Sequence, residues 1–234
     1  MSMSRPDARG ALRSLREAAR GLYLRLLPRP DHREVFSRIY RRNVWGDPES
    51  VSGPGSTRAR GEDFRDDLAE LLERIGARVL LDAPCGDFNW IEPVADRMER
   101  YVGVDVVPEL VEKNQELHGG GRRSFACADL TRDPLPRADV VLCRDCLVHF
   151  SFADIRAALG NFRESGSTYL LTTTFLDTRR NLDIRTGGWR ELNLEEAPFR
   201  FPPPLALVDE KCTHSGGRYR SKRLALWRID SLPL

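Results

Sequence analysis

The stretch Arg78-Val-Leu-Leu-Asp-Ala-Pro-Cys-Gly-Asp-Phe-Asn-Trp90 decides how the rest of the chain is interpreted. It begins with an apolar run long enough for one buried strand and turns at Pro-Cys-Gly-Asp, with a helix expected near Ile91. A strand that enters a helix through a glycine-containing turn places backbone N–H groups where they can hold a polar ligand. The stretch therefore predicts the first strand of a nucleotide-binding α/β sheet.

The composition fits one well-packed domain with an added terminal segment. The 234 residues are 41% hydrophobic and 31% charged, as is ordinary for a soluble protein. A net charge of +2 is too small to indicate nucleic-acid binding, and no run of 18 apolar residues predicts a transmembrane segment. The five cysteines lie mostly in strand-like runs, which is typical of a reduced, cytoplasmic protein. Cys143 and Cys146 match C-x-x-C, but no second pair completes a zinc site.

The N-terminal part is expected to be helical. Residues 1–30 carry many arginines, and leucines recur opposite them at helical spacing. Such a helix can lie on a membrane surface, bind a partner or act as a transit peptide. We favour packing on the core or on a second copy of the chain, so a homodimer is conceivable. A second helix should follow Asp31 as its cap, with an apolar stripe through Phe36 and Tyr40.

Strand-like and helix-like segments alternate from residue 60 to residue 175. Further strands are expected at residues 101–106, 124–128, 139–143 and 168–174, with helices between them. This alternation predicts a Rossmann-like, doubly wound, mostly parallel sheet, which two late strands near residues 205–208 and 224–229 complete to seven strands with a terminal antiparallel strand. Two stretches look irregular: residues 45–56, either a linker or a loop that closes over a ligand, and residues 176–204, a functional loop.

Acidic side chains stand at several expected strand ends. Asp82, Asp105, Asp129 and Asp145 should meet at the carboxyl edge of the sheet, where open α/β sheets bind their ligands. Asp105 follows Gly86 by 19 residues, the separation expected for an acid that binds ribose hydroxyls. Each acid alone is equally well a helix cap or a solvated turn residue.

The order of these motifs resembles the class I S-adenosylmethionine-dependent methyltransferases over about residues 60–175. Asp82-Ala-Pro-Cys-Gly-Asp-Phe keeps the acid and central glycine of the family's first motif, although Pro84 and Phe88 replace flanking glycines. Val102-Gly-Val-Asp105 and Ala128-Asp129-Leu130 match the second and third motifs. The chain is also similar to a bacterial subgroup that combines this turn with Arg144-Asp-Cys-Leu-Val-His149, an upstream Ser52-Gly-Pro-Gly-Ser56 loop and a later Gly187-Gly-Trp-Arg-Glu-Leu-Asn-Leu194 segment.

The resemblance implies S-adenosylmethionine as cofactor and a division into two parts. Residues 1–60 would form a helical extension and cofactor-covering loop, and residues 61–234 the methyltransferase domain with a substrate loop near 176–204. The implied cofactor site holds the methionine part at the Gly86 turn, the ribose at Asp105, the adenine beside Asp129 and Leu130, and the cofactor carboxylate at the Ser52–Ser56 loop. Because Pro84 has no N–H, Gly86 and Asp87 should supply the donors of the turn. The full expected cofactor set is Ser52, Gly53, Ser56, Asp82, Pro84, Gly86, Asp87, Trp90, Asp105, Val106, Asp129, Leu130 and Arg144.

Methyl transfer to a hydroxyl needs an aligned nucleophile and a group that takes its proton. His149 is the candidate base, because histidine titrates near neutrality, and Asp145 could orient it, bind a cation or contact the substrate. The alternative for His149 is a packing or capping role. Trp45, Arg144, Trp189, Arg190 and Asn193 are the candidate acceptor-binding residues, a mixture that suits a sugar-like or other small hydroxylated molecule.

Competing interpretations remain. A dinucleotide-dependent oxidoreductase should carry G-x-G-x-x-G after the first strand, where only Gly86 is present. A carboxyl or amine acceptor is the alternative to a hydroxyl, and a scaffold that binds a partner through the basic helix is the non-enzymatic one. No ligand spacing specifies a metal, although Asp145 and Asp177 make a divalent cation conceivable.

Overall fold

The computed structural model describes residues 23, 29–212 and 215–234. The expected basic helix of residues 1–30 therefore lies almost wholly outside the described residues, and so does its expected role in a homodimer. No helix in the described ranges is long and apolar enough to cross a membrane.

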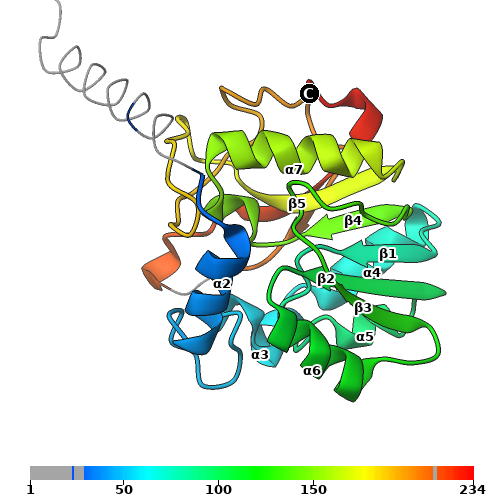
Figure 1. The fold of residues 1–234 in the computed structure, drawn as a ribbon. Helices are drawn as coiled ribbons and strands as arrows, with labels where there is room; N and C mark the ends of the chain where they lie inside the picture. Colours follow the sequence, from blue (N-terminus) through cyan, green and yellow to red (C-terminus); the bar gives the residue numbers. More distant parts are fainter. Residues whose placement is uncertain (1–22, 24–28, 213–214) are drawn as a thin grey trace, which may run out of the picture.

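Seven strands form one sheet in the order β3-β2-β1-β4-β5-β7-β6 (Figure 1). The parallel strands are β1 (Val79–Asp82), β2 (Arg100–Asp105), β3 (Arg123–Cys127), β4 (Val140–Cys143) and β5 (Tyr169–Phe175). The last two strands are β6 (Ala206–Asp209) and β7 (Lys222–Arg228), and β7 runs antiparallel to β5 on one side and β6 on the other. The predicted doubly wound, mostly parallel sheet with a late antiparallel strand is confirmed.

Helices cover both faces of this sheet. They are α2 (His32–Arg41), α3 (Arg58–Glu62), α4 (Arg65–Arg74), α5 (Glu92–Ala95), α6 (Pro108–His118) and α7 (Phe152–Glu164), with single turns η1 (Pro54–Ser56), η2 (Leu147–His149), η3 (Ser215–Gly217) and η4 (Ile229–Ser231). Two of the helix starts follow from side-chain caps: the Asp31 carboxylate accepts from the Glu34 N–H at 3.3 Å, and the Ser151 hydroxyl from the Asp154 N–H at 3.1 Å.

The core divides between the two faces because neighbouring strand residues point in opposite directions. Leu81 and Val141 pack with α7, whereas Leu80 and Val140 pack with α4 and α5. Both faces of the central strands are buried, which explains their nearly continuous apolar sequence.

Part of the irregular segment after β5 belongs to the core. Leu192, Leu194 and Phe199 are buried in the cluster that includes α7. The side-chain amide of Asn181 donates to the carbonyls of Asn193 and Ala197. These hydrogen bonds satisfy backbone carbonyl groups and so stabilise a segment that has no regular secondary structure. Part of the predicted functional loop therefore has a packing role.

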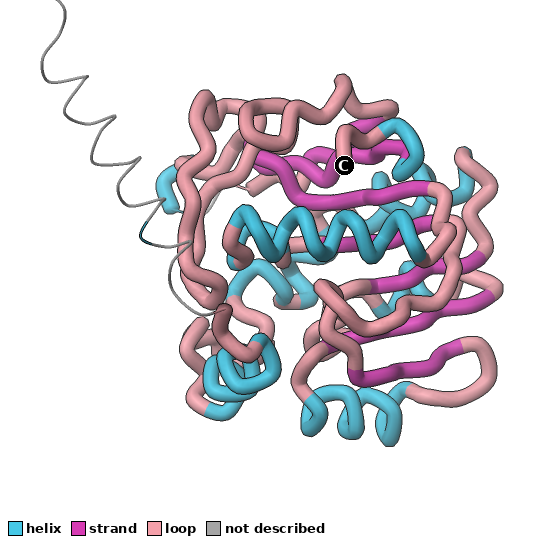
Figure 2. Tube along the Cα trace, turned by 45° about the horizontal axis from the view of Figure 1, so that its top comes forward, coloured by secondary structure: helices cyan, strands magenta, loops and turns pink. Residues whose placement is uncertain are grey.

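The sheet presents its ligand-binding edge where the strand order reverses, between β1 and β4. Figure 2 shows α2 and much of the irregular chain at one end of the strands. One common cavity is lined by residues of α2, of the 45–56 loop that follows it, and of the strand ends.

Candidate functional site

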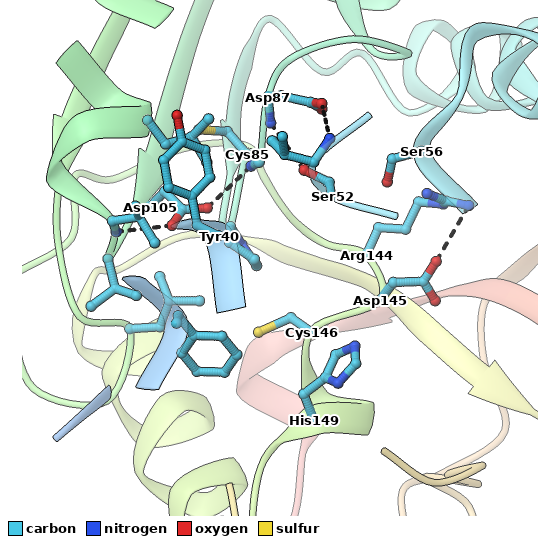
Figure 3. A pocket seen from close by; sticks show the side chains of 18 of the residues that line it. Tyr40, Ser52, Ser56, Cys85, Asp87, Asp105, Arg144, Asp145, Cys146 and His149 are labelled. Atoms are coloured by element: carbon cyan, nitrogen blue, oxygen red, sulfur yellow. Dashed lines mark hydrogen bonds and ion pairs between the residues drawn. The ribbon is translucent and has the colours of Figure 1, made fainter. Parts of the chain in front are cut away.

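The cavity lies between the carboxyl ends of β1–β4, α2 and the 45–56 loop (Figure 3). It brings together most of the residues expected from the sequence. Those that line it are Trp45, Ser52, Ser56, Asp82, Pro84, Gly86, Asp87, Trp90, Asp105, Val106, Asp129, Leu130, Arg144, Asp145 and His149.

The sequence did not indicate that α2 would form a wall of this cavity. His32, Phe36 and Tyr40 face it, at the helical spacing of four residues. The apolar stripe through Phe36 and Tyr40 was visible in the sequence, but its partner was not. Phe150, Cys85 and Cys146 also line the cavity without having been expected there.

The loop of residues 45–56 is fastened to the turn after β1. The Val51 N–H donates to Asp87 Oδ2 at 3.0 Å, and the Asn89 side-chain amide donates to the Ser56 carbonyl at 3.1 Å. Gly86 has φ +52°, and a Cβ there would lie 2.3 Å from Ser52 Oγ. The loop packs so closely on this turn that only glycine fits, and the loop is not a free linker.

The two expected donors of the turn are already engaged. The Gly86 N–H donates to Asp105 Oδ2 at 3.2 Å, and the Asp87 N–H donates to Ser52 Oγ at 3.1 Å. These bonds shape the turn itself. The expectation that Gly86 and Asp87 donate to a ligand therefore finds no support in this structure.

Asp105 stands at the end of β2 with room for further hydrogen bonds. Its Oδ1 accepts from the Val107 N–H at 3.1 Å, and its Oδ2 accepts from Gly86. Burial raises the pKa of Asp105 to about 6, against these hydrogen bonds, which lower it. Each carboxylate oxygen has a second lone pair, so the group can also accept from a pair of hydroxyls.

Asp82, at the end of β1, is the most protonation-prone acid of the site. Burial raises its pKa to about 7, although the Tyr101 hydroxyl donates to Oδ2 at 2.6 Å and acts to lower it. Both side chains are buried. Asp82 thus anchors the turn through Tyr101 as well as lining the cavity.

Asp129 belongs to what we call the His32 cluster, which consists of His32, Asp129 and Asp154. His32 Nδ1 lies 3.1 Å from Asp129 Oδ1, and its Nε2 lies 3.3 Å from Asp154 Oδ2. Burial acts to lower the pKa of His32, but these two carboxylates outweigh it and raise the pKa to about 9. The Thr131 hydroxyl also donates to Asp129, so this carboxylate fastens α2 to the body of the protein.

Arg144 and Asp145 belong to a second group, the Lys222 cluster, together with Glu210 and Lys222; Asp145 is partly exposed and the other three are buried. Arg144 Nη2 lies 2.6 Å from Glu210 Oε2, and Lys222 Nζ lies 2.6 Å from Asp145 Oδ2 and 3.0 Å from Glu210 Oε2. The Arg144 guanidinium also lies over the rings of Phe64 and Trp90, so its position is fixed. Lys222 was missed, although it is one of only three lysines in the chain.

Asp145 is held in an unfavourable backbone conformation with φ +50°. Its N–H donates to the Thr173 hydroxyl oxygen at 2.8 Å, which helps to maintain this conformation. Burial acts to raise the pKa of Asp145, but Lys222 and Arg144 outweigh it and hold the pKa below the usual range. Asp145 therefore favours its ionised form and can accept hydrogen bonds.

His149 has a defined tautomer because its Nδ1 lies 2.7 Å from the Gly188 carbonyl oxygen. A carbonyl only accepts, so Nδ1 carries the hydrogen and Nε2 has a lone pair. Burial lowers the pKa of His149, and the Gly188 contact and the charge of Asp145 offset this only in part. The Trp45 ring packs on the imidazole with centroids 5.1 Å apart.

Two of the expected acceptor-binding residues have structural partners instead. The Arg190 guanidinium donates to the carbonyls of Leu147, Val148 and Phe150 at 2.7–2.9 Å. Asn193 donates to the carbonyls of Leu176 and Thr178. Neither lines the cavity. Through these bonds Arg190 supports the turn that carries His149.

Trp189 and Gly53 lie beside the cavity, in a second hollow that is continuous with it. This hollow also contains Trp45, Asp145 and His149, which both linings share. Among the described residues, no group of three or more His, Cys, Asp or Glu side chains is arranged to hold a metal ion.

The cavity suits a nucleoside-containing ligand. Asp105 offers acceptor capacity for a diol, while Val106, Leu130 and Phe150 provide apolar surface for a planar group. Carboxylates predominate among its charged groups, which favours a ligand with a positive centre.

Comparison with known proteins agrees with this fold. Residues 80–165, less than half of the chain, match the family model described as a methyltransferase domain. A search of curated proteins found no match.

Two solved structures share the fold over most of the chain. Magnesium protoporphyrin IX methyltransferase from Synechocystis PCC 6803, with bound S-adenosylmethionine, is 16% identical, with a TM-score of 0.54. The superposed part makes up 86% of this chain and 99% of the Synechocystis chain. Human N-acetylserotonin methyltransferase, also with S-adenosylmethionine, is 16% identical, with a TM-score of 0.56. The superposed part makes up 92% of this chain and 67% of the human chain.

The fold is thus that of the class I S-adenosylmethionine-dependent methyltransferases, and residues 80–165 correspond to a methyltransferase domain. The predicted enzyme class, EC 2.1.1, is borne out by this match together with the fold. The predicted cofactor agrees with what these two structures hold.

Proposed function

We propose that the protein is an S-adenosylmethionine-dependent methyltransferase that methylates a hydroxyl of a small molecule, with His149 as the base. The observation that carries the proposal is the hydrogen bond from His149 Nδ1 to the Gly188 carbonyl, which leaves Nε2 as a proton acceptor where the two hollows meet. In this proposal residues 61–234 form the catalytic domain, and α2 with the 45–56 loop covers the cofactor.

The cavity residues divide between the parts of the cofactor. Asp105 accepts from the ribose hydroxyls, Val106 and Leu130 hold the adenine between them, and Asp82 and the Gly86 turn lie beside the methionine part. Because Asp129 is already bonded to His32 and Thr131, we assign it to positioning α2 over the adenine. When bound, S-adenosylmethionine supplies a methyl group on a positively charged sulfur.

The protein residues then align the acceptor and take its proton. Asp145, held ionised by Lys222, accepts a hydrogen bond from the acceptor and orients it. His149 Nε2 removes the hydroxyl proton, and Trp45 and Arg190 keep the imidazole and its turn in place. A carboxyl or amine acceptor is the alternative, and it does not need His149 as a base.

The test replaces His149 by alanine. Turnover should fall about 10²- to 10⁴-fold while S-adenosylmethionine affinity, measured by calorimetry, stays within about twofold, since general-base catalysis contributes on this order. His118→Ala, which removes a histidine of α6 outside the cavity lining, is the matched control and should keep full turnover.

The pH profile gives an independent check. Because burial lowers the pKa of His149, turnover should rise with pH, with the midpoint of the rise below the ordinary histidine value of 6.5. Full turnover by His149→Ala would contradict the base role, and absent cofactor binding by the wild type would contradict the whole proposal.

A further inference from the structure

The second hollow opens beside the cofactor cavity and is built from distant parts of the chain. Trp45, Ser52, Asp145 and His149 belong to both linings. The remaining residues are those of the 53–55 loop, Phe175 at the end of β5, Trp189, Cys212, Tyr219 and Lys222. A molecule in this hollow therefore meets the cofactor cavity at Asp145 and His149.

Aromatic rings form much of its wall. Phe175, Trp189 and Tyr219 contact one another edge to face, with centroids 5.4–6.1 Å apart. The Trp189 side chain is 43% exposed, although tryptophan side chains in folded proteins are on average much more buried. Exposed aromatic surface at the mouth of a hollow is typical of a ligand site.

The charged groups of this wall are already paired with one another. Lys222 is the only lysine or arginine among the described residues that line the hollow, and its ammonium lies between Asp145 and Glu210. Phosphate and carboxylate ligands need an available cation, which this wall does not offer. A charged acceptor such as a sugar phosphate is therefore disfavoured.

Two side chains of the wall that both hollows share and that can accept a proton or hydrogen bond, His149 and Asp145, are partly engaged already. His149 Nδ1 is used by the Gly188 carbonyl, and Asp145 Oδ2 is used by Lys222. His149 Nε2 has a lone pair for an acceptor, and Asp145 Oδ1, which lies 3.5 Å from the Thr173 hydroxyl, has a second lone pair. Together they can position one hydroxyl group. A polyhydroxylated sugar would leave several hydroxyls without partners, which costs free energy when they are buried.

We propose that the second hollow binds the methyl acceptor and that this acceptor is an uncharged aromatic alcohol, a phenol. The proposal rests on the proposed methyltransferase function and narrows its substrate class. In the step, the bond between the methyl carbon and sulfur breaks as the bond to the phenol oxygen forms. The phenol proton passes to His149 Nε2, and S-adenosylhomocysteine and the methyl ether are the products.

The test compares acceptor probes on the full chain saturated with S-adenosylhomocysteine. Calorimetry should show that 2-naphthol and catechol bind, and that methyl α-D-glucopyranoside and glucose 6-phosphate do not. With S-adenosylmethionine in its place, mass spectrometry should detect a methyl ether of at least one of the two phenols. Failure of both phenols to bind, or equal binding of either sugar, would overturn the acceptor class.

The cofactor result separates this failure from failure of the proposed function. If S-adenosylhomocysteine binds but the phenols do not, only the acceptor class is wrong. If S-adenosylhomocysteine itself does not bind, the methyltransferase proposal is wrong.

Variants locate the binding surface. Trp189→Ala should weaken 2-naphthol binding roughly fivefold to tenfold, since an aromatic contact contributes on this scale, and Trp189→Phe should restore most of it. Leu182→Ala is the matched control, because Leu182 is similarly exposed on the same irregular segment but lies outside the hollow. Cofactor affinity should stay unchanged in all three variants, and equal naphthol binding by Trp189→Ala and the wild type would contradict the assignment.

Discussion

The two charge clusters beside the cavity differ in the side chain at their centre. The His32 cluster places an imidazole between two carboxylates and joins α2 to the strand ends. The Lys222 cluster uses an ammonium and a guanidinium to fix Asp145 between the two hollows. The His32 cluster loses its central charge as pH rises through about 9, the pKa of His32, so the attachment of α2 should weaken over that range. In the Lys222 cluster, two cations, Lys222 and Arg144, lie beside Asp145.

The largest effect is expected from breaking the Lys222 cluster. Lys222→Met removes the ammonium shared by Glu210, which is buried, and Asp145, which is partly exposed. Breaking a buried ion pair typically costs about 3–5 kcal/mol of the free energy of unfolding. Urea denaturation of the wild type and the variant measures this loss of free energy of unfolding. Lys113→Met, on the exposed side of α6, should have little effect, and equal stability of the two variants would show that the cluster contributes nothing.

Breaking the His32 cluster should have a pH-dependent effect. The pKa of His32 is about 9 in the folded chain and 6.5 in the unfolded chain. The charged imidazole therefore contributes fully to the free energy of unfolding below pH 6.5, and this contribution is lost as pH rises through about 9. His32→Ala should therefore cost on the order of 3 kcal/mol at pH 6 and much less at pH 10. Denaturation of both proteins across this range measures the difference, and a cost that does not change with pH would sink the explanation.

The smallest effect is expected from an exposed ion pair of the same helix. Arg41 of α2 bonds to Glu109 of α6, but the two side chains are 64% and 41% exposed. Arg41→Ala should change the free energy of unfolding by no more than about 1 kcal/mol, and added salt should reduce the effect further. A loss as large as that of His32→Ala would mean that burial is not what distinguishes the two contacts.

The fold was predictable because its signals are local. The apolar run before Asp82, the acid after each strand and the cap at Ser151 are each readable within about ten residues. Parallel strands place their carboxyl ends at one edge, so the sheet alone brings Asp82, Asp105 and Asp145 together. The cofactor side of the site follows from that rule.

The proposed acceptor site was only partly predictable because its residues come from separate segments of the chain. Trp189 was expected near the acceptor and lies in the second hollow, whereas Arg190, its neighbour, turns to the backbone of η2. Residue type does not tell whether an arginine will meet a ligand or a set of carbonyls. Lys222 and Glu210 carried no motif that could have indicated their partners.

The sequence by itself determined which segments form strands, the turn at Gly86 and the acids at the strand ends, because strand periodicity and turn chemistry act over short distances. Only the tertiary structure decided which of those acids are open to a ligand. Packing of α2 engages Asp129 with His32, and packing of β7 against β5 brings Lys222 to Asp145. Contacts between residues so far apart depend on how whole elements pack, which no local pattern specifies.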